Sequence, residues 1–387
     1  MIDFTLTDEQ QMLIEMTHNF VEKEMLPHEE TLERTDTLPP KLAASLKKRA
    51  IELGLHACNL PEEVGGGGLD AVSVMLIEKE LGRTSLALAE CAHRPLNILA
   101  SCEGEQVKKF LEPTIRGEKR DCIAMTEPGA GSDLRGMECK AELDKDEWII
   151  NGEKHFISQA SISDYCVLFA ATGEDETDKG LKKRISAFLV DFNDHGVEVA
   201  PGYKNVSHRG YTNNILRFDN ARIPQWRIMG PEGDGFRIVN QWLGPTRLTV
   251  AATCVARAER AFEIALNYSA TREQFGQKIG KFQGISFELA DMATEIKMAN
   301  LMLLETAWKI DQGSVTPEDC AMTKLFCSEM LSRVADQSIQ TVGGMGLMED
   351  LPLERIWRDA RLERIWDGTS EIQRHIISRG LLRPLEK

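Results

Sequence analysis

The chain has 387 residues, of which 42% are hydrophobic and 28% are charged, a balance typical of globular proteins with a large core. Forty-six basic residues against 61 acidic ones give a formal net charge of -15, which disfavours a nucleic-acid-binding surface. No apolar run approaches the roughly 20 residues that a membrane-spanning helix needs. We therefore expect two or three soluble domains that bind neither nucleic acid nor the membrane interior.

The nine cysteines are scattered, and none forms a Cys-x-x-Cys pair. This pattern indicates neither a disulfide framework nor a zinc cluster, so we predict no metal site and a reducing environment. The first residues have no basic stretch followed by an apolar core, which argues against a secretory signal. A cytoplasmic location follows as an expectation, with a precursor trimmed ahead of this numbering left open.

The first third of the chain is predicted to be helical. Residues 7–10, Thr-Asp-Glu-Gln, form a capping-box pattern in which the Thr and Gln side chains bond to free backbone groups. Apolar residues recur at helical spacing over 42–53 and stop at Gly54. The four glycines at 65–68 are interpreted as a loop before a helix over 71–81. A phosphate-binding loop is the less favoured alternative, because no Lys-Ser or Lys-Thr follows.

The pattern changes to that of strands after residue 121. Residues 148–150 and 156–158 are predicted to be strands joined by a two-residue turn at Asn151-Gly152. Further strands are expected at 165–170, 185–191, 197–200 and 215–218. Their short links favour an antiparallel sheet or barrel over a parallel dinucleotide-binding sheet. The charged residues 173–183 are expected to form an exposed loop.

Long helical stretches return from about residue 235, at 252–268, 285–312 and 321–342. Their length and one-sided apolar spacing favour a helical bundle. The predicted fold is thus an α protein with an inserted β domain. Its predicted domains are an N-terminal helical domain (1–121), a middle β domain (122–233) and a C-terminal four-helix bundle (234–387).

Four segments contain residue types suited to ligand binding. Residues 124–133 combine close glycines with Thr and Ser hydroxyls, which suits the polar edge of a ring, although an ordinary surface loop has the same composition. Arg272 opens Arg-Glu-Gln-Phe-Gly at a predicted helix boundary, where a guanidinium can bind a pyrophosphate or form a surface salt bridge. Residues 340–346 contain three glycines but lack the spacing of a Rossmann fingerprint. Residues 364–373 place Asp367 just before a helix starting near Thr369, where helix capping alone would explain the carboxylate.

Taken together and in this order, the four segments resemble the acyl-CoA dehydrogenase family from about residue 4 to residue 382. The resemblance implies the family fold of helices, β domain and helical bundle. It also implies bound FAD and assembly as a homotetramer.

The resemblance further implies a role for individual residues. Residues 123–132 would line the flavin, with Thr126 bonded to the ring and Ser132 near the thioester. Phe156 would cover the ring, and the Ser158 hydroxyl would lie near the flavin N5 atom; Glu371 stands where Gln is more usual. The implied cofactor residues are Ile123, Met125, Thr126, Gly131, Ser132, Phe156, Ser158, Arg272, Gln274, Phe282, Gln283, Gln340, Gly343, Gly344, Thr369 and Glu371. The implied substrate residues are Ser132, Leu243, Thr246, Arg247, Gly368 and Cys91, with Cys91 and His93 equally compatible with helix packing.

The implied reaction removes a proton beside the thioester carbonyl while a hydride passes to the flavin. Most relatives have Glu where this chain has Asp367, and some place the base near the position of Thr246, which carries no carboxylate. Asp is one methylene shorter than Glu, and a misplacement of about 1 Å can cost roughly a hundredfold in rate. The favoured interpretation is that Asp367 is the base and meets a differently placed substrate, as in the cyclic acyl-CoA dehydrogenases that use Asp.

The predicted substrate is therefore an alicyclic thioester such as cyclohexane-carboxyl-CoA, with 2-branched or hydroxylated acyl chains as alternatives. The resemblance implies an electron-transferring flavoprotein as electron acceptor. Two other functions stay open at this point. One is a flavin oxidase, including a nitroalkane oxidase-like enzyme with an Asp base, and the other is a catalytically silent flavin-binding member.

Overall fold

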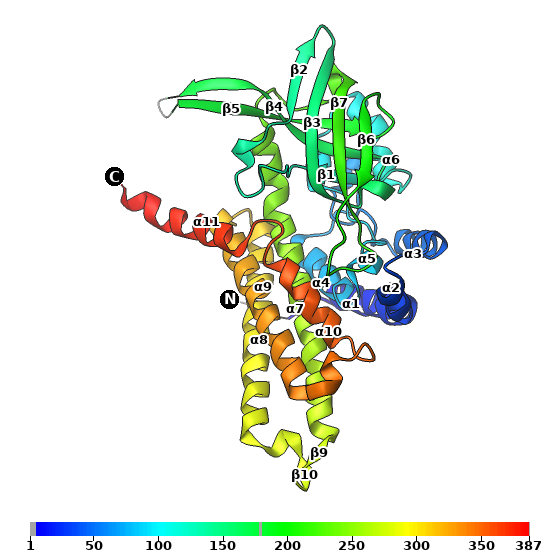
Figure 1. Ribbon diagram of the computed structural model, residues 1–387, viewed down its shortest axis with the longest axis vertical. Helices are drawn as coiled ribbons and strands as arrows, with labels where there is room; N and C mark the ends of the chain where they lie inside the picture. Colours follow the sequence, from blue (N-terminus) through cyan, green and yellow to red (C-terminus); the bar gives the residue numbers. More distant parts are fainter. Residues whose placement is uncertain (1–4, 178–179, 387) are drawn as a thin grey trace.

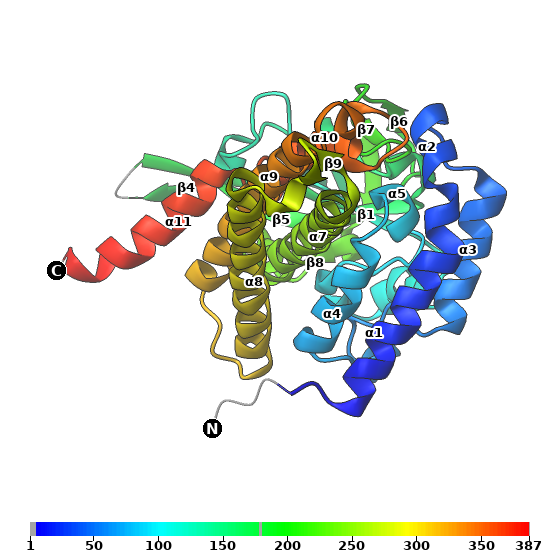
Figure 2. The same cartoon turned by 90° about the horizontal axis from the view of Figure 1, so that it is seen from below.

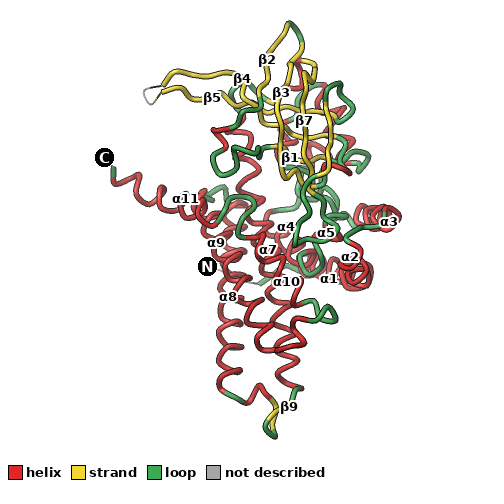
Figure 3. Tube along the Cα trace, in the orientation of Figure 1, coloured by secondary structure: helices red, strands yellow, loops and turns green. Residues whose placement is uncertain are grey.

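The computed structural model describes residues 5–177 and 180–386. Figure 1 shows the sheet at one end of the molecule, the N-terminal helices beside its lower edge, and a long helical bundle that extends to the opposite end. The last helix points away from the body, and Figure 3 shows the same division between strand and helix along the trace. The three-part fold predicted from the sequence is confirmed.

The N-terminal part contains short helices that pack around one core, which includes Phe20, Leu46 and Ile77. The capping box forms as predicted, because the Thr7 hydroxyl accepts from the Gln10 backbone N–H at 3.2 Å and the Gln10 side chain accepts from the Thr7 N–H. The helices are α1 (Asp8–Phe20), α2 (Glu29–Thr35), α3 (Pro40–Glu52), α4 (Ala71–Leu81), α5 (Leu86–Ala89) and α6 (Glu112–Ile115).

The middle part is a strongly curled sheet with strand order β6-β7-β3-β2-β4-β5-β8, and β1 pairs with β4. Most pairings are antiparallel, as predicted, but β1 and β2 each run parallel to β4. The strands are β1 (Asp121–Ala124), β2 (Lys140–Asp144), β3 (Glu147–Ser158), β4 (Tyr165–Thr177), β5 (Gly180–Asp191), β6 (Val197–Pro201), β7 (Asn213–Pro224) and β8 (Ile228–Met229).

The predicted turn at Asn151-Gly152 is wrong, because both residues lie inside the uninterrupted strand β3. Gly152 has φ 147°, and a Cβ atom there would come within 2.7 Å of the Cys139 Cα. The glycine is therefore required by the close approach of another backbone segment. The tight turn lies earlier, between β2 and β3, where Lys145 adopts a left-handed conformation with φ 60°.

The expectation of an exposed loop at 173–183 is also wrong. Strands β4 and β5 continue as a paired hairpin as far as Thr177 and Gly180, and residues 178–179 lie outside the described part. The charges of this segment lie on the hairpin surface, where Arg184 bonds to Asp175 and Glu232. High charge therefore reflected solvent exposure and did not indicate a break in the strands.

Strand β4 shows why the sheet has two cores. Tyr165, Val167 and Phe169 enter a core shared with N-terminal residues and the first turns of α7. The intervening Cys166 and Leu168 point into a second core that the curled strands themselves enclose. Alternation along one strand thus fastens the sheet to the helices on one face and closes it on the other.

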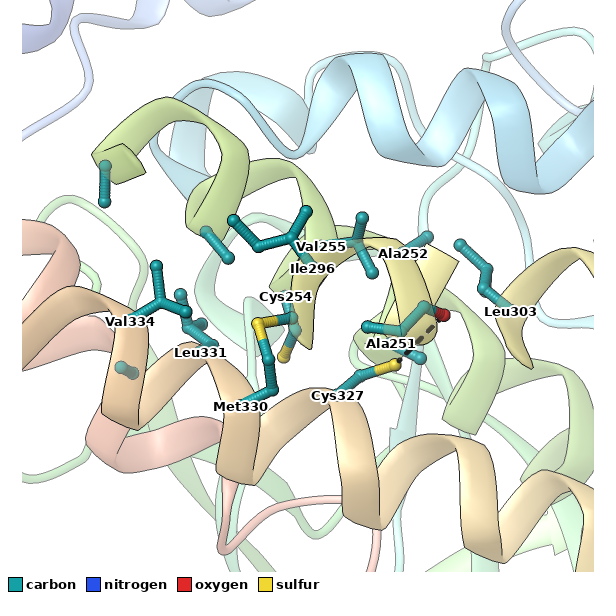
Figure 4. Packing of buried hydrophobic residues seen from close by; sticks show 14 of the residues in the cluster. Ala251, Ala252, Cys254, Val255, Ile296, Leu303, Cys327, Met330, Leu331 and Val334 are labelled. Atoms are coloured by element: carbon teal, nitrogen blue, oxygen red, sulfur yellow. Dashed lines mark hydrogen bonds between the residues drawn. The ribbon is translucent and has the colours of Figure 1, made fainter. Parts of the chain in front are cut away.

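The C-terminal part is built on α7 (Gly235–Thr271), whose contacts with α4, α8 and α9 make it the central helix. Figure 2, seen from below, shows it between these elements. Small residues on α7 pack against Ile296 and Leu303 of α8 and Leu331 of α9 (Figure 4). The predicted helices are confirmed within longer ones. The remaining elements are β9 (Glu273–Gln274), β10 (Gln277–Lys278), α8 (Gln283–Asp311), α9 (Pro317–Val342), α10 (Leu353–Glu363) and α11 (Ser370–Leu382).

A buried carboxylate joins the N-terminal helices to the bundle. Glu29 is 2% exposed and accepts from Arg260 of α7 at 2.8 Å, from Arg355 of α10, and from Thr84 and the Ser85 backbone. Burial would raise the pKa of Glu29, but Arg260 and Arg355 outweigh it and hold the pKa below its ordinary value. None of the helices in the described ranges is long and apolar enough to cross a membrane.

Replacing Glu29 with Gln should lower the free energy of unfolding by roughly 3 kcal/mol, because two arginines would lose their buried carboxylate. The measurement is the urea midpoint at fixed FAD concentration. Glu30→Gln is the control, since its ion pair with Arg34 is exposed and should contribute less than about 1 kcal/mol. Equal midpoints for the two variants would contradict this role of Glu29.

Candidate active site

Asp367 lies on the turn between α10 and α11. Its φ of 51° and the 96° of Gly368 place two successive residues in the left-handed region, where a non-glycine residue is strained. The N-cap of α11 is Thr369, whose hydroxyl accepts from the Ile372 N–H at 3.3 Å. The capping explanation for Asp367 is therefore wrong, and its carboxylate is free for another role.

The Asp367 carboxylate is partly buried among groups from three helices. The Thr246 hydroxyl of α7 hydrogen-bonds to it, and two cations, Arg247 of α7 and Lys324 of α9, lie near it. Burial is the largest influence and raises the pKa of Asp367 to about 6, with Glu363 adding to the rise while Lys324 and Arg247 oppose it. A carboxylate with this pKa is ionised at neutral pH and basic enough to accept a proton.

A second buried carboxylate supports the residue before Asp367. Glu363 is completely buried and accepts from Arg257 at 2.7 Å and from the Trp366 indole N–H at 2.6 Å. His208 lies 3.3 Å from the same carboxylate and stacks on the Trp366 ring at 5.4 Å. Burial would raise the pKa of Glu363, but His208 and Arg257 hold it below its ordinary value. This network fixes Trp366 and, through it, the start of the Asp367 turn.

The loop after β1 is also held by a buried ion pair. Glu127, 6% exposed, binds Lys154 of β3 at 2.6 Å and accepts from the Cys139 N–H at 3.1 Å. The Lys154 ammonium also donates to the Met125 carbonyl at 3.0 Å. Glu127 lies within the segment predicted to line the flavin, but Lys154 and the ion pair between the two residues were not predicted from sequence. Ile123 and Met125 pack against the core, whereas Gly131 and Ser132 are exposed at the tip of the loop.

Phe156 and Ser158 end the neighbouring strand. The pairing of β3 with β7 shifts register between Lys154 and Ile157, and Phe156 within this bulge has φ 56°. The bulge leaves the phenylalanine ring 59% exposed beside Thr126, whose carbonyl accepts from the His155 N–H at 2.8 Å. Bulges commonly redirect a side chain at a functional site.

Tyr211 is a site residue that sequence reasoning missed. Its hydroxyl hydrogen-bonds to Ser158, and its ring lies edge-on to Trp366, 6.5 Å away. Burial raises the pKa of Tyr211, and the Asp367 charge contributes. Tyr211 therefore connects Ser158 of the sheet with the Asp367 turn of the bundle. No local sequence signal marks it, because this position depends on the meeting of two domains.

The structure divides the predicted residues into two groups. Thr246, Arg247, Gly368 and Thr369 lie on α7 or on the turn before α11, around Asp367. Ser158 is linked to this turn through Tyr211, the Thr126 carbonyl is bonded to the neighbouring end of β3, and Leu243 packs against the core shared by the sheet and the start of α7. Cys91 lies in the N-terminal core, and His93 is buried against Asp121 at 2.5 Å, so the packing interpretation holds for both. Glu371 is exposed on the first turn of α11.

The second group lies at the far end of the bundle, around β9 and β10 in Figure 1. Arg272 follows the end of α7, as predicted, and the exposed Phe275 ring contacts Phe282 at 6.2 Å. Gly343 and Gly344 follow α9 at the same end and are exposed, with open space where a Cβ would lie. The residues in this second group are Arg272, Gln274, Phe282, Gln283, Gln340, Gly343 and Gly344.

The region between sheet and bundle fits a flavin ring. Gly129 and Gly131 border open space, the Phe156 ring is largely exposed, and the Thr126 and Ser158 hydroxyls lie on the two neighbouring segments, with Ser158 bonded to Tyr211. Such an exposed aromatic beside polar groups is what a planar cofactor with a polar edge requires. In the described ranges, no three His, Cys, Asp or Glu side chains are placed to hold a metal ion.

Comparison with known proteins agrees with this geometry. Three domain models match the chain: acyl-CoA dehydrogenase N-terminal domain at residues 7–118, middle domain at 122–221 and C-terminal domain at 233–382. The probable acyl-CoA dehydrogenase YngJ of Bacillus subtilis is 38% identical, covering 99% of this chain and 100% of the relative.

Two solved structures are similar over nearly the whole chain. Butyryl-CoA dehydrogenase from Megasphaera elsdenii has a TM-score of 0.89 and 31% identity, covering 99% of this chain and 100% of the other. The FAD complex of PigA has a TM-score of 0.90 and 30% identity, covering 98% and 99%. The chain belongs to the acyl-CoA dehydrogenase family. It is an FAD-dependent oxidoreductase that dehydrogenates an acyl-CoA.

Lys154→Met should weaken FAD binding about tenfold, or ~1.4 kcal/mol, because the loop at 125–132 would lose both bonds of the Lys154 ammonium. Fluorescence titration of the apoprotein with FAD measures this change. Lys140→Met, at an exposed position on β2, is the matched control and should bind FAD as the unmodified protein does. An unchanged dissociation constant for Lys154→Met would show that the ion pair does not order the loop.

Asp367→Asn should stabilise the protein at neutral pH. Since the folded-state pKa of Asp367 is raised from 3.8 to about 6, the stability present at low pH is lost as pH rises through 6. Asn carries no charge, so its advantage should grow between about pH 4 and pH 7 and reach on the order of 2 kcal/mol for this partly exposed group. Urea unfolding across that pH range, at fixed FAD, should show this widening gap, whereas a pH-independent difference would contradict the raised pKa.

Proposed function

We propose that Asp367 is the general base that removes the proton beside the thioester carbonyl. The observation behind this proposal is a partly buried carboxylate on a strained turn, hydrogen-bonded to Thr246, with its pKa raised to about 6. Burial has made the carboxylate more basic, while the nearby cations keep it ionised at neutral pH. Strain at a non-glycine residue is characteristic of active sites.

The thioester carbonyl would be polarised by the Asp367 backbone N–H. Within the described ranges this N–H donates to no other protein group, so it is free to bind an oxyanion. A donor placed where enolate charge develops lowers the barrier to removing a weakly acidic proton. When bound, FAD supplies a hydride acceptor for the β-carbon of the substrate. Thr126, Phe156 and Ser158 would orient the flavin, and the proton would go to Asp367.

The residues at the two ends of the bundle support a shared cofactor site. Arg272, Gln274 and the glycines after α9 would hold the adenosine diphosphate part of FAD bound mainly to another subunit, while Thr369 and Glu371 would contact the cofactor near the turn. A homotetramer would bring the two groups together. The exposed Phe287 and Trp308 on α8, 61% and 54% exposed, provide apolar surface for such an assembly. The proposed location is the cytoplasm.

The acyl group is proposed to be alicyclic, with cyclohexane-carboxyl-CoA as the leading substrate and 2-branched thioesters as alternatives. Asp is shorter than Glu by one methylene, so the α-carbon must lie nearer the turn for productive contact. Ser132, Leu243, Thr246, Arg247 and Gly368 would contact the substrate, whereas Cys91 is buried in the N-terminal core. The electrons gained by the flavin would leave to an electron-transferring flavoprotein.

Anaerobic stopped-flow bleaching of the flavin tests this function with cyclohexane-carboxyl-CoA, isobutyryl-CoA and butyryl-CoA. Asp367→Asn should retain FAD but reduce the bleaching rate by about a thousandfold or more. Asp367→Glu should gain on butyryl-CoA and lose on the cyclic thioester. Undiminished bleaching in Asp367→Asn would reject Asp367 as base.

The acceptor is tested separately with the unmodified enzyme. Slow reoxidation by oxygen, together with rapid reoxidation by an electron-transferring flavoprotein, is expected of a dehydrogenase. Prompt peroxide formation without another acceptor would instead show an oxidase. Retained FAD without bleaching by any of the three thioesters would contradict catalysis on these acyl classes.

A further inference from the structure

Lys324 is a buried cation next to the Asp367 turn. Its side chain is 0% exposed, and its ammonium donates to the Gly368 carbonyl at 2.9 Å. Across residues 5–177 and 180–386, no carboxylate oxygen lies within 4 Å of this ammonium. Burying a lysine without an ion-pair partner is costly, so a purely structural position would favour an apolar residue here.

Among the charged groups around Lys324, Asp367 is the anion that it can serve as a partner. Burial lowers the pKa of Lys324, whereas Asp367 and Glu363 of α10 favour its charged form and Arg247 of α7 opposes it. Cys254 of α7 also lies near, but burial raises the pKa of this thiol well above its ordinary value, so it is neutral. Glu363 already binds Arg257 at 2.7 Å, which leaves the Asp367 carboxylate as the anion without a directly bonded cation.

The same carbonyl has a second, uncharged donor. The Gln373 amide, also 0% exposed, donates to the Gly368 carbonyl at 2.8 Å and to the Asp367 carbonyl at 3.2 Å. A Cβ atom on Gly368 would come within 2.7 Å of this amide nitrogen, so the turn and Gln373 fit closely. The Gly368 carbonyl therefore has one charged donor, Lys324, and one neutral donor, Gln373, which we call the charged and the neutral anchor of the turn. Substituting each residue separates their contributions.

We propose that Lys324 is a positioning residue for Asp367, which holds the left-handed turn through the Gly368 carbonyl and supplies the positive charge that keeps the carboxylate ionised. This inference rests on the proposed role of Asp367 as the base. Removing the ammonium would leave Asp367 facing Glu363, Arg247 and Tyr211 without its second cation. The carboxylate would then hold its proton up to a higher pH.

The first test is the pH dependence of anaerobic flavin bleaching in the holoenzyme with saturating thioester. Lys324→Met keeps the length and volume of the side chain. It should raise by about one pH unit the pH below which the bleaching rate falls, which is called the acid limb of the profile. Gln373→Met removes the neutral anchor and should slow bleaching without moving the limb. Lys108→Met, at an exposed position in the N-terminal part of the chain, is the charge control and should leave the whole profile unchanged.

Lys324→Gln is a second variant that keeps a donor for the carbonyl but removes the charge, so it should show the same shift as Lys324→Met. The titration can also be followed without substrate. The stability gap between each Lys324 variant and its Asp367→Asn double variant should keep widening up to a pH about one unit higher than the corresponding gap in the parent protein.

The inference would be overturned if, in both Lys324 variants, the acid limb of the bleaching profile and the pH dependence of the stability gap were the same as in the parent protein. Asp367 would then still be the base. A shift of equal size in Gln373→Met would also overturn it, because the effect would then come from turn geometry and not from charge. If Asp367→Asn is still bleached at the parent rate, the proposed function itself fails. The stopped-flow comparison of the three thioesters detects that failure independently of the Lys324 variants.

Discussion

The candidate site depends on one electrostatic constraint, which is that a carboxylate must stay ionised while it is partly withdrawn from water. Burial raises the pKa of Asp367 to about 6, and Arg247 and Lys324 limit that rise. Stronger burial without these cations would keep the carboxylate protonated, and full exposure would make it a weak base. The helices α7, α9 and α10 each provide one of the charges that set this balance.

Buried ion pairs hold the walls of the site, and each of them joins different elements. Glu127 and Lys154 fix the loop after β1, Glu363 and Arg257 fix the end of α10, and Glu29 ties the N-terminal helices to the bundle. A buried charge is tolerated only with good partners, so these pairs specify how the elements must meet. The rigid scaffold leaves the exposed side chains between sheet and bundle to contact the ligands.

Local signals in the sequence predicted the local structure well. The Thr7 capping box, the helix over 71–81 and the helix end at Arg272 all depend on residues close together in the chain, and all are confirmed. Gly152 was misread because a glycine required by a crossing backbone looks the same as one required by a turn. The hairpin at 173–183 was missed because surface charge hides the alternation of an exposed strand.

The supporting residues of the site could not be found in the same way. Tyr211 reaches the Asp367 turn only where the middle domain meets the bundle, and Lys324 and Glu363 reach it through the packing of α9 and α10. Asp367 itself was found through family resemblance, and its helix-capping alternative could be rejected only once Thr369 was seen to cap α11. Non-local packing thus determines the chemistry of a side chain whose position the sequence already indicates.

The central claim is tested most directly by a crystal structure of Asp367→Asn holoenzyme with a bound acyl-CoA. If Asp367 is the base, the residue 367 side chain lies within about 3.5 Å of the substrate α-carbon, on the face opposite the flavin, with the thioester oxygen bonded to the residue 367 backbone N–H. A structure in which this side chain points away and another carboxylate faces the α-carbon would show that Asp367 is not the base.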